Sequence, residues 1–132
     1  RVSTEQTAWM DALARQSPGG VYTLPHAHVD GAELDMSFSG LKTAVVNLAH
    51  NAQQKGEELD AAALARDFTK AVSDELVPRA MTAARMTGRR TLVAAGGVAA
   101  NSIIRADLEE ACRRRGLPYY LIDGPYAPPL DW

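Results

Sequence analysis

The sequence has little cysteine, no long apolar run and little net charge, and each of these absences limits what kind of protein it can be. It has a single cysteine, Cys112, so no disulfide can form within it, which suits a reducing compartment. It has no apolar run long enough to cross a membrane, and its first residues do not have the pattern of a signal peptide. Its formal net charge is only −2, so an RNA partner would need a local basic patch or a second protein.

Hydrophobic residues make up 46% of the 132 residues, which is enough to bury one core, so we expect a single domain over residues 1–132. Arg113, Arg114 and Arg115 form a basic run with two readings. They are either a binding patch or, the favoured reading, cations that complement the dipole of a last helical turn. Because the first residue is arginine and not methionine, we expect the chain to be part of something longer.

A short apolar stretch and a glycine pair organise the C-terminal half. Residues 91–95 are bounded by two arginines and two glycines, which predicts a buried strand. Gly96 and Gly97 carry no side chain, so a ligand can approach the backbone there. A helix that begins at Asn101 and Ser102 would point unpaired N–H groups into the same space, which suits an anion. A plain tight turn is the alternative.

Apolar residues at helical spacing predict helices over residues 1–16, 41–54 and 102–115, and a longer one that follows Asp60. Ser39 and Asp60 are the predicted N-caps, and Gly56 is a predicted residue just past a helix end. Pro78 predicts a kink or a break in the longest helix. Four residues of that helix step by four and are expected to be buried against a sheet or the 41–54 helix: Leu64, Phe68, Val72 and Leu76.

The strand over 91–95, the helix over 102–115 and a second strand over 118–122 make a βαβ unit, which implies parallel strands and a right-handed crossover. The fold class is therefore α/β. Ligands in open α/β sheets bind beyond the carboxyl ends of the strands, where Gly96 and Gly97 fall.

A shorter polar stretch carries a weaker signal. Residues 21–24 are a candidate strand, and His26, His28 and Asp30 follow at alternate positions. That spacing puts three metal-ligand types on one face of an extended segment. Solvated polar residues in a loop are the favoured reading.

Two motifs resemble a known family. They are Ser37-Phe-Ser-Gly-Leu-Lys-Thr-Ala44 and Leu92-Val-Ala-Ala-Gly-Gly-Val-Ala-Ala-Asn101, with a helix after the second. Both resemble the universal tRNA threonylcarbamoyladenosine transferases, which older names call glycoprotease or O-sialoglycoprotein endopeptidase. The resemblance covers residues 11 to 122 and rests on two separate motifs in the right order.

The resemblance implies part of an ATPase-like fold of the actin, Hsp70 and sugar-kinase class (RNase H-like), of which this chain forms much of the C-terminal lobe. It places Gly96 and Gly97 near the phosphate of threonylcarbamoyl-AMP, an ATP-type ligand, and has Asn101 hydrogen-bond the adenylate. The asparagine offers both a carbonyl and an NH2 group for this purpose.

The chain also departs from the family. The family holds a divalent metal, iron or zinc, with two histidines of an upstream helix and an aspartate after the last parallel strand, and neither motif is present. His26 and His28 lie elsewhere, and Asp123 or Asp131 would fit only by a forced alignment. Residues 1–10 and 123–132 depart from the family pattern. No metal ligand and no catalytic residue is therefore assigned in this chain.

The function that the resemblance implies is tRNA modification by an acyltransferase, which moves a threonylcarbamoyl group to the adenosine beside the anticodon. It implies a cytoplasmic protein with tRNA and accessory proteins as partners and no membrane, and it leaves a homo- or heterodimer open. The alternative is a non-catalytic module of the same fold that pairs with the modifying enzyme. We expect the 132 residues alone to be inactive. No Ser-His-Asp or metalloprotease spacing supports a protease.

Overall fold

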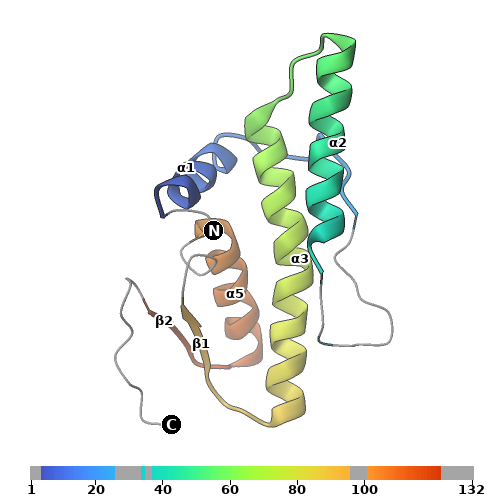
Figure 1. Cartoon of the computed structure of the whole chain (residues 1–132). Helices are drawn as coiled ribbons and strands as arrows, with labels where there is room; N and C mark the ends of the chain where they lie inside the picture. Colours follow the sequence, from blue (N-terminus) through green and yellow to red (C-terminus); the bar gives the residue numbers. More distant parts are fainter. Residues whose placement is uncertain (1–3, 26–33, 35–36, 96–100, 123–132) are drawn as a thin grey trace.

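The computed structural model describes residues 4–25, 34, 37–95 and 101–122. Within these residues the element order is α1 (Thr4–Ala14), α2 (Ser39–Lys55), α3 (Ala61–Thr87), β1 (Leu92–Ala95), α5 (Ser102–Arg115) and β2 (Tyr119–Ile122). The long α3 runs through the middle, α1 and α5 pack against it, and the two strands lie beside α5 (Figure 1). None of the helices in this part of the chain has both the length and the apolar content needed to cross a bilayer.

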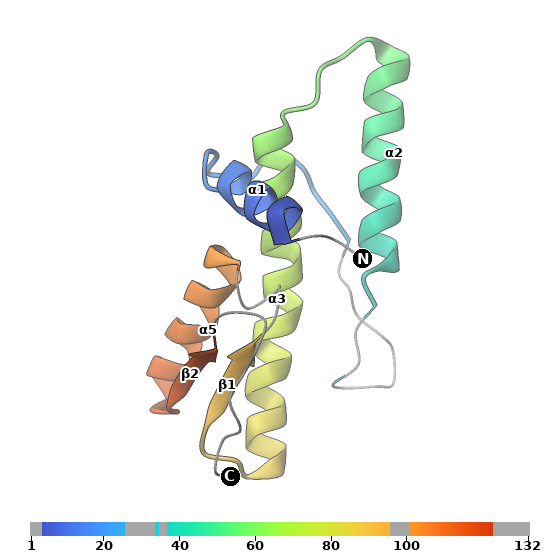
Figure 2. The same ribbon diagram turned by 60° about the vertical axis from the view of Figure 1, so that its left-hand side comes forward.

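The two strands form a parallel pair, as the sequence predicts. Their register runs from Leu92 opposite Tyr119 to Ala95 opposite Ile122, and α5 connects the end of one strand to the start of the other. The described residues therefore contain a mixed α/β arrangement with a parallel two-stranded sheet (Figure 2).

Helix α5 is stabilised both by capping residues at its two ends and by one buried apolar face. Asn101 caps its start, and Gly116, at φ 64°, ends it in the left-handed conformation that glycine adopts without a steric penalty. Ile104, Leu108 and Cys112 recur every four residues and are all buried. The predicted helix and the predicted core position of Cys112 are confirmed.

Helix α3 is continuous from Ala61 to Thr87, so the break predicted at Pro78 does not occur. Asp60 caps its start by accepting the N–H of Ala63 at 3.1 Å, as predicted. The proline removes one backbone donor, which costs about 3 kcal/mol in an isolated helix. Contacts with α1 and α5 offset that cost, and the Arg79 guanidinium donates to the Glu75 carbonyl oxygen at 3.1 Å in the same turn.

The buried face of α3 is not the predicted one. The four large residues at positions 64, 68, 72 and 76 are only half-buried. The buried positions carry alanines, polar residues and one methionine instead: Ala63, Ala65, Thr69, Ser73, Glu75 and Met81. The polar ones have partners, since the Ser73 hydroxyl donates to Asp107 Oδ2 at 2.5 Å and Glu75 pairs with Arg79. Small side chains let α1 and α5 come close to α3, and this close packing decides which face is buried.

Helix α2 begins at Ser39, so Ser39 is not its N-cap. Phe38 occupies the cap position and makes no side-chain cap bond, while the Ser39 hydroxyl lies 3.0 Å from that of Ser37. The predicted glycine at the other end is confirmed, because Gly56 has φ 67°. Leu41 and Ala52 are the buried residues of this helix.

The segment after α1 is a loop that is hydrogen-bonded to α3, and not the predicted strand over 21–24. The Asp67 carboxylate of α3 accepts the backbone N–H groups of Gly20, Val21 and Tyr22 at 2.6, 3.0 and 2.8 Å. These three donors bond to a side chain, so no partner strand is required. Gly19 makes the close approach feasible, because it has φ 75° and a Cβ there would lie 2.7 Å from Asp67 Oδ1.

Candidate functional site

The candidate site lies at the start of α5, beyond the carboxyl end of β1. Of the three residues predicted there, Gly96 and Gly97 fall in the segment 96–100, outside the described residues. Asn101 is described and is half-buried. The geometry of the site is therefore built from Asn101 and its neighbours.

The Asn101 side chain caps α5. Its Oδ1 atom accepts the backbone N–H groups of Ile103 and Ile104, each at 3.0 Å. The carbonyl half of the amide is thus engaged by the helix, while the predicted contact of Asn101 with the adenylate stays a prediction. The NH2 half makes no hydrogen bond within the described part of the chain, so it is the half that remains as a donor.

A carboxylate from α1 holds the first residue of α5. Asp11 Oδ1 accepts the backbone N–H of Ser102 at 3.0 Å and its hydroxyl at 2.9 Å, across 91 positions of sequence. Asp11 is only 8% exposed, so this contact is nearly closed to water. With the bonds to Asn101, the first three N–H groups of α5 are all paired, and the expected unpaired donors for an anion are not there.

Asp11 was missed by sequence reasoning, although one signal points to it. It lies three residues before Ala14, so both occupy one helix face, and both are buried. A carboxylate on the buried face of a helix needs a partner, because burying an unpaired charge is costly. The pattern does not say where the partner lies.

Two substitutions test how this contact holds α5 in place. We expect Asp11→Ala and Asn101→Ala each to lower the free energy of unfolding by about 1–2 kcal/mol, because each leaves partly buried N–H groups of α5 without an acceptor. Urea titration of the chain measures this, with Glu57→Ala in an exposed loop as the control. A loss for Asp11→Ala that lies within the control's scatter of about 0.5 kcal/mol contradicts the role given to Asp11.

Metal ligands do not gather in the described residues. Within 4–25, 34, 37–95 and 101–122, no group of three or more histidine, cysteine, aspartate or glutamate residues is placed to hold an ion. His26, His28 and Asp30, the candidates from spacing, lie outside these ranges, as do Asp123 and Asp131.

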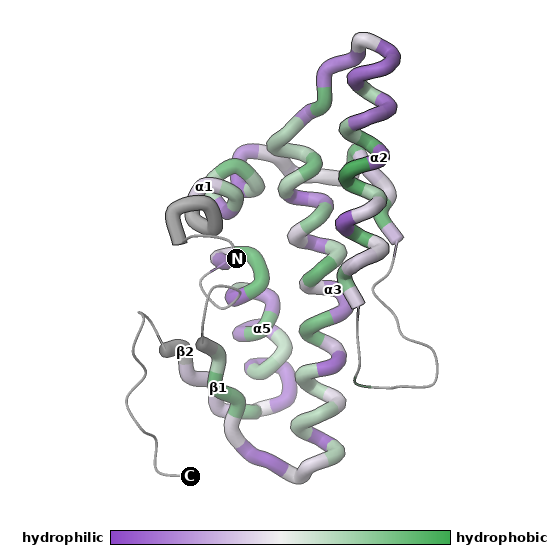
Figure 3. The backbone as a smooth tube through the Cα atoms, viewed as in Figure 1, coloured by the Kyte–Doolittle hydropathy of each residue, from purple (hydrophilic) through white to green (hydrophobic). Residues whose placement is uncertain are grey.

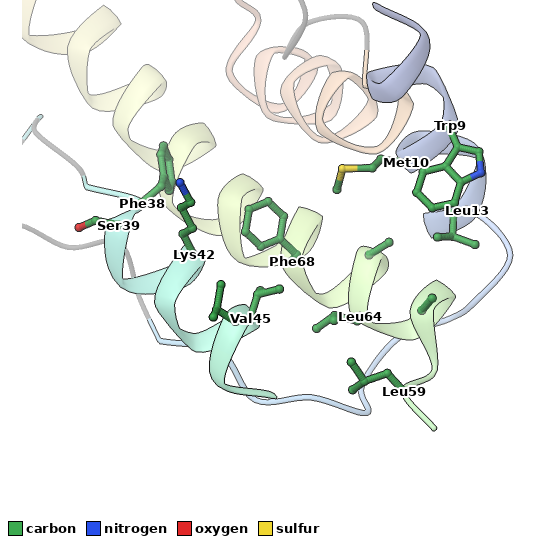
Figure 4. A pocket seen from close by; sticks show the side chains of 13 residues that line it. Trp9, Met10, Leu13, Phe38, Ser39, Lys42, Val45, Leu59, Leu64 and Phe68 are labelled. Carbon is green, nitrogen blue, oxygen red and sulfur yellow. The ribbon is translucent and has the colours of Figure 1, made fainter. Parts of the chain in front are cut away.

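An apolar groove of about 620 Å³ lies between α1, α2 and α3, and Asn101 is not among its lining residues (Figure 4). Its lining residues are Trp9, Met10, Leu13, Phe38, Ser39, Lys42, Val45, Val46, Leu59, Ala61, Leu64, Ala65 and Phe68. Lys42 is the one charged residue among them and is exposed. An apolar lining can hold a hydrophobic surface, and it offers no acid or base besides the exposed Lys42, so the groove is not the catalytic candidate.

Two side chains near α5 that could act as nucleophiles, Cys112 and Tyr119, are held in their protonated forms. Burial raises the pKa of the Cys112 thiol, so little thiolate is present at neutral pH. Burial, followed by the nearby Glu109 carboxylate, raises the pKa of Tyr119, whose buried hydroxyl has no partner in the described part of the chain. Covalent catalysis by either group is therefore not supported.

The comparisons with known proteins agree with the motifs. The family model for tRNA N6-adenosine threonylcarbamoyltransferase, TsaD, matches residues 3–127. The chain is 40% identical over 111 residues to the enzyme of that name from Moorella thermoacetica, covering 84% of this chain and 32% of that protein. It is 41% identical over 109 residues to the one from Desulfitobacterium hafniense, covering 83% of this chain and 30% of the relative.

A third relative with the same name, from Bacillus cereus, is 45% identical over 101 residues, covering 76% of this chain and 29% of the relative. The chain therefore spans about a third of the length of the curated relatives it matches. With a family model matched over nearly its whole length, the chain belongs to the tRNA N6-adenosine threonylcarbamoyltransferase family.

Proposed function

We propose that this chain is part of a transferase that moves a threonylcarbamoyl group from threonylcarbamoyl-AMP to the exocyclic amine of the adenosine beside the tRNA anticodon. Family membership and the names of the relatives support this. In the reaction, the amine nitrogen bonds to the carbamoyl carbon, and the bond from that carbon to the adenylate oxygen breaks. AMP leaves with the electron pair, and the amine loses a proton.

The chain supplies part of a larger fold. We assign it as one partial domain, much of the C-terminal lobe of an actin- and Hsp70-like ATPase fold. The parallel pair of β1 and β2, with α5 crossing between them and α3 packed against α5, supports that assignment. Such a lobe binds and orients a ligand at the carboxyl ends of its strands.

The observation that carries the proposal is the NH2 half of the Asn101 amide, which has no hydrogen-bond partner among the residues that the structure describes. Its oxygen caps α5, so its NH2 group is left to donate to an acceptor atom beyond the end of β1. Adenylate offers such acceptors on its base, ribose and phosphate. Gly96 and Gly97 are the proposed backbone contacts to the phosphate, because a phosphate there cannot use the first N–H groups of α5.

The described residues include no set of ligands that fits iron or zinc, so the metal that the resemblance implies takes no part in the roles of this chain. The residues of this chain are given binding and orienting roles only. tRNA is the proposed acceptor substrate.

We expect the chain alone to bind AMP or ATP no more tightly than about millimolar. Asn101, Gly96 and Gly97 would contact the ligand from one side only, so its phosphates stay in water. Each hydrogen bond there contributes only about 0.5–1.5 kcal/mol net, against an association cost of several kcal/mol. Isothermal titration calorimetry measures this. Micromolar binding that depends on Asn101 would show that the 132 residues already form a complete site.

In the full-length protein that carries this sequence, we expect Asn101→Asp to lower transfer at least tenfold. Aspartate caps a helix as well as asparagine does, so α5 stays intact, but aspartate lacks the NH2 donor and adds a charge that repels phosphate. The readout is incorporation of labelled threonine into tRNA, measured with the unfolding midpoint of the same variant.

Asn51→Ala, at an exposed position of α2, is the matched control and should leave transfer unchanged. If Asn101→Asp transfers at the wild-type rate, Asn101 is not a ligand donor and the proposed site is wrong. If transfer falls only together with the unfolding midpoint, the loss is structural and the ligand role fails as well.

A further inference from the structure

Six arginines gather at one end of the molecule, which we call the arginine end: Arg85, Arg89, Arg90, Arg113, Arg114 and Arg115. The parallel register places the starts of β1 and β2 side by side. Each strand is preceded by the C-terminal end of an arginine-bearing helix, α3 for β1 and α5 for β2. Both helix ends lie at the lower end of the molecule in two views (Figures 1 and 2).

The charge at the arginine end differs from that of the rest of the chain. It holds six of the 14 basic residues, and all six are exposed. Glu110 pairs with Arg113 and Arg114, whose hydrogen bonds lower the pKa of its carboxyl group. The other four arginines have no carboxylate partner among the residues that the structure describes. Since the whole chain has a net charge of −2, the remainder is acidic.

Helix dipoles do not account for this cluster. A cation offsets the dipole only within the last turn, which explains Arg85 and the α5 arginines. Arg89 and Arg90 lie beyond Gly88, in the connection to β1 that Figure 3 colours as hydrophilic. Two helix ends carry about half a negative charge each, and six guanidinium groups exceed that.

We propose that the arginine end binds the phosphate backbone of the tRNA substrate. This rests on the proposed function, which supplies a polyanionic partner. Guanidinium groups pair with phosphate through two parallel hydrogen bonds, and such contacts give affinity without reading sequence. Because the net charge of the chain gives no general attraction to RNA, any attraction that this chain itself supplies comes from a local basic patch.

The distance to the candidate site suits this role. Asn101 is at one end of α5 and Arg115 is at the other, and a 14-residue helix spans about 21 Å. The arginine end therefore contacts tRNA backbone about 20 Å from the reacting base, and α5 sets that spacing. The arginine end holds the stem of the tRNA, while the opposite end of α5 faces the threonylcarbamoyl donor.

The test is fluorescence anisotropy of the chain with a labelled RNA stem-loop that carries the anticodon loop, over a range of KCl concentrations. We expect R89A/R90A/R115A to bind at least tenfold more weakly than wild type. The slope of log affinity against log salt should fall by about 2, at about 0.7 for each lost phosphate contact. All three residues are exposed, so the unfolding midpoint should not change.

Two further variants sharpen the result. Lys55→Ala is the matched control, because Lys55 is also an exposed cation in a last helical turn but lies at the far end of α2 (Figure 1). It should bind within twofold of wild type. R89K/R90K/R115K keeps the charges and should keep the salt slope. The inference is overturned if the alanine variant binds within twofold of wild type, if Lys55→Ala weakens binding equally, or if the lysine variant loses the slope.

The RNA-binding test can contradict this inference without contradicting the proposed function, and the reverse, because RNA binding is measured without transfer. If Asn101→Asp abolishes transfer while R89A/R90A/R115A binds RNA normally, the arginine end is wrong and the function stands. If the alanine variant loses RNA binding while Asn101→Asp transfers normally, the binding surface stands and the assigned site does not. Arginine-dependent binding to phosphatidylserine vesicles without RNA binding would also overturn the inference.

Discussion

Replacing Leu108 by alanine is expected to lower the free energy of unfolding by about 2–5 kcal/mol. Leu108 is 5% exposed, and the helix that carries it, α5, packs against α3. Most buried apolar residues in the described part of the chain are small, and the large ones there are Leu41, Met81, Ile104 and Leu108. A cavity at one of so few large side chains removes a substantial share of the core, and close-packed neighbours fill it only partly.

Urea titration with a linear extrapolation measures this loss. Met86→Ala is the control, because Met86 is 58% exposed in the last turn of α3, and its loss should be within about 0.5 kcal/mol. Phe68→Ala should fall between the two, since Phe68 is half-buried in the apolar groove and not in the core. Equal losses for Leu108→Ala and Met86→Ala would mean that α5 does not pack on α3 in solution.

The elements that the sequence predicted well are those with local signals. The strand pair and α5 follow from short apolar runs, a stripe every four residues, and a glycine that ends the helix. Each signal lies within one element, so the periodicity of side chains is enough to find it.

The buried face of α3 was mispredicted because hydrophobicity was the wrong guide there. Ala63 and Ser73 are buried since close helix packing requires small side chains, while the larger Phe68 borders a groove. The stripe of large residues marks where apolar surface is available. It does not show which part of that surface another helix covers.

Polar contacts between distant residues could not be predicted for a different reason. Asp11 meets Ser102 across 91 positions, and Asp67 meets Tyr22 across 45. A carboxylate that accepts backbone N–H groups leaves no periodic pattern, because its partners are chosen by the fold. The pairing of the Ser102 N–H, which changes how a ligand can bind at the start of α5, was hidden for that reason. The roles of Gly96 and Gly97 remain predictions.

Removing the carboxylate that pins the loop after α1 should also have a large effect. We expect Asp67→Ala to lower the free energy of unfolding by about 2–4 kcal/mol, because three backbone N–H groups lose a charged acceptor and only partly regain one from water. The loop should also open. Hydrogen exchange at Gly20, Val21 and Tyr22 reports this directly, since Asp67 is the acceptor for all three.

The pH dependence distinguishes the carboxylate from a packing effect. Burial favours the neutral acid, but the N–H groups of Tyr22, Gly20 and Val21 outweigh it and hold the pKa of Asp67 below its ordinary value of 3.8. A pKa that is lower in the folded state gives stability that is fully present above the ordinary value and is lost as pH falls through the folded value. The stability difference between wild type and Asp67→Ala should therefore be constant above about pH 5 and shrink as pH falls through 3.8 toward the lower folded pKa.

Two matched variants decide the cause of that loss. Asp74→Ala is on the same helix and breaks a pair with Lys70 in which both side chains are more than half exposed, so it should cost under about 1 kcal/mol. Asp67→Asn keeps the size of the side chain but turns an NH2 group toward backbone donors, so it should lose most of what Asp67→Ala loses. If Asp67→Asn is as stable as wild type at neutral pH, the charge is not what holds the loop. A stability difference that stays constant down to low pH leads to the same conclusion, since only an ionised carboxylate makes the contact depend on pH in that range.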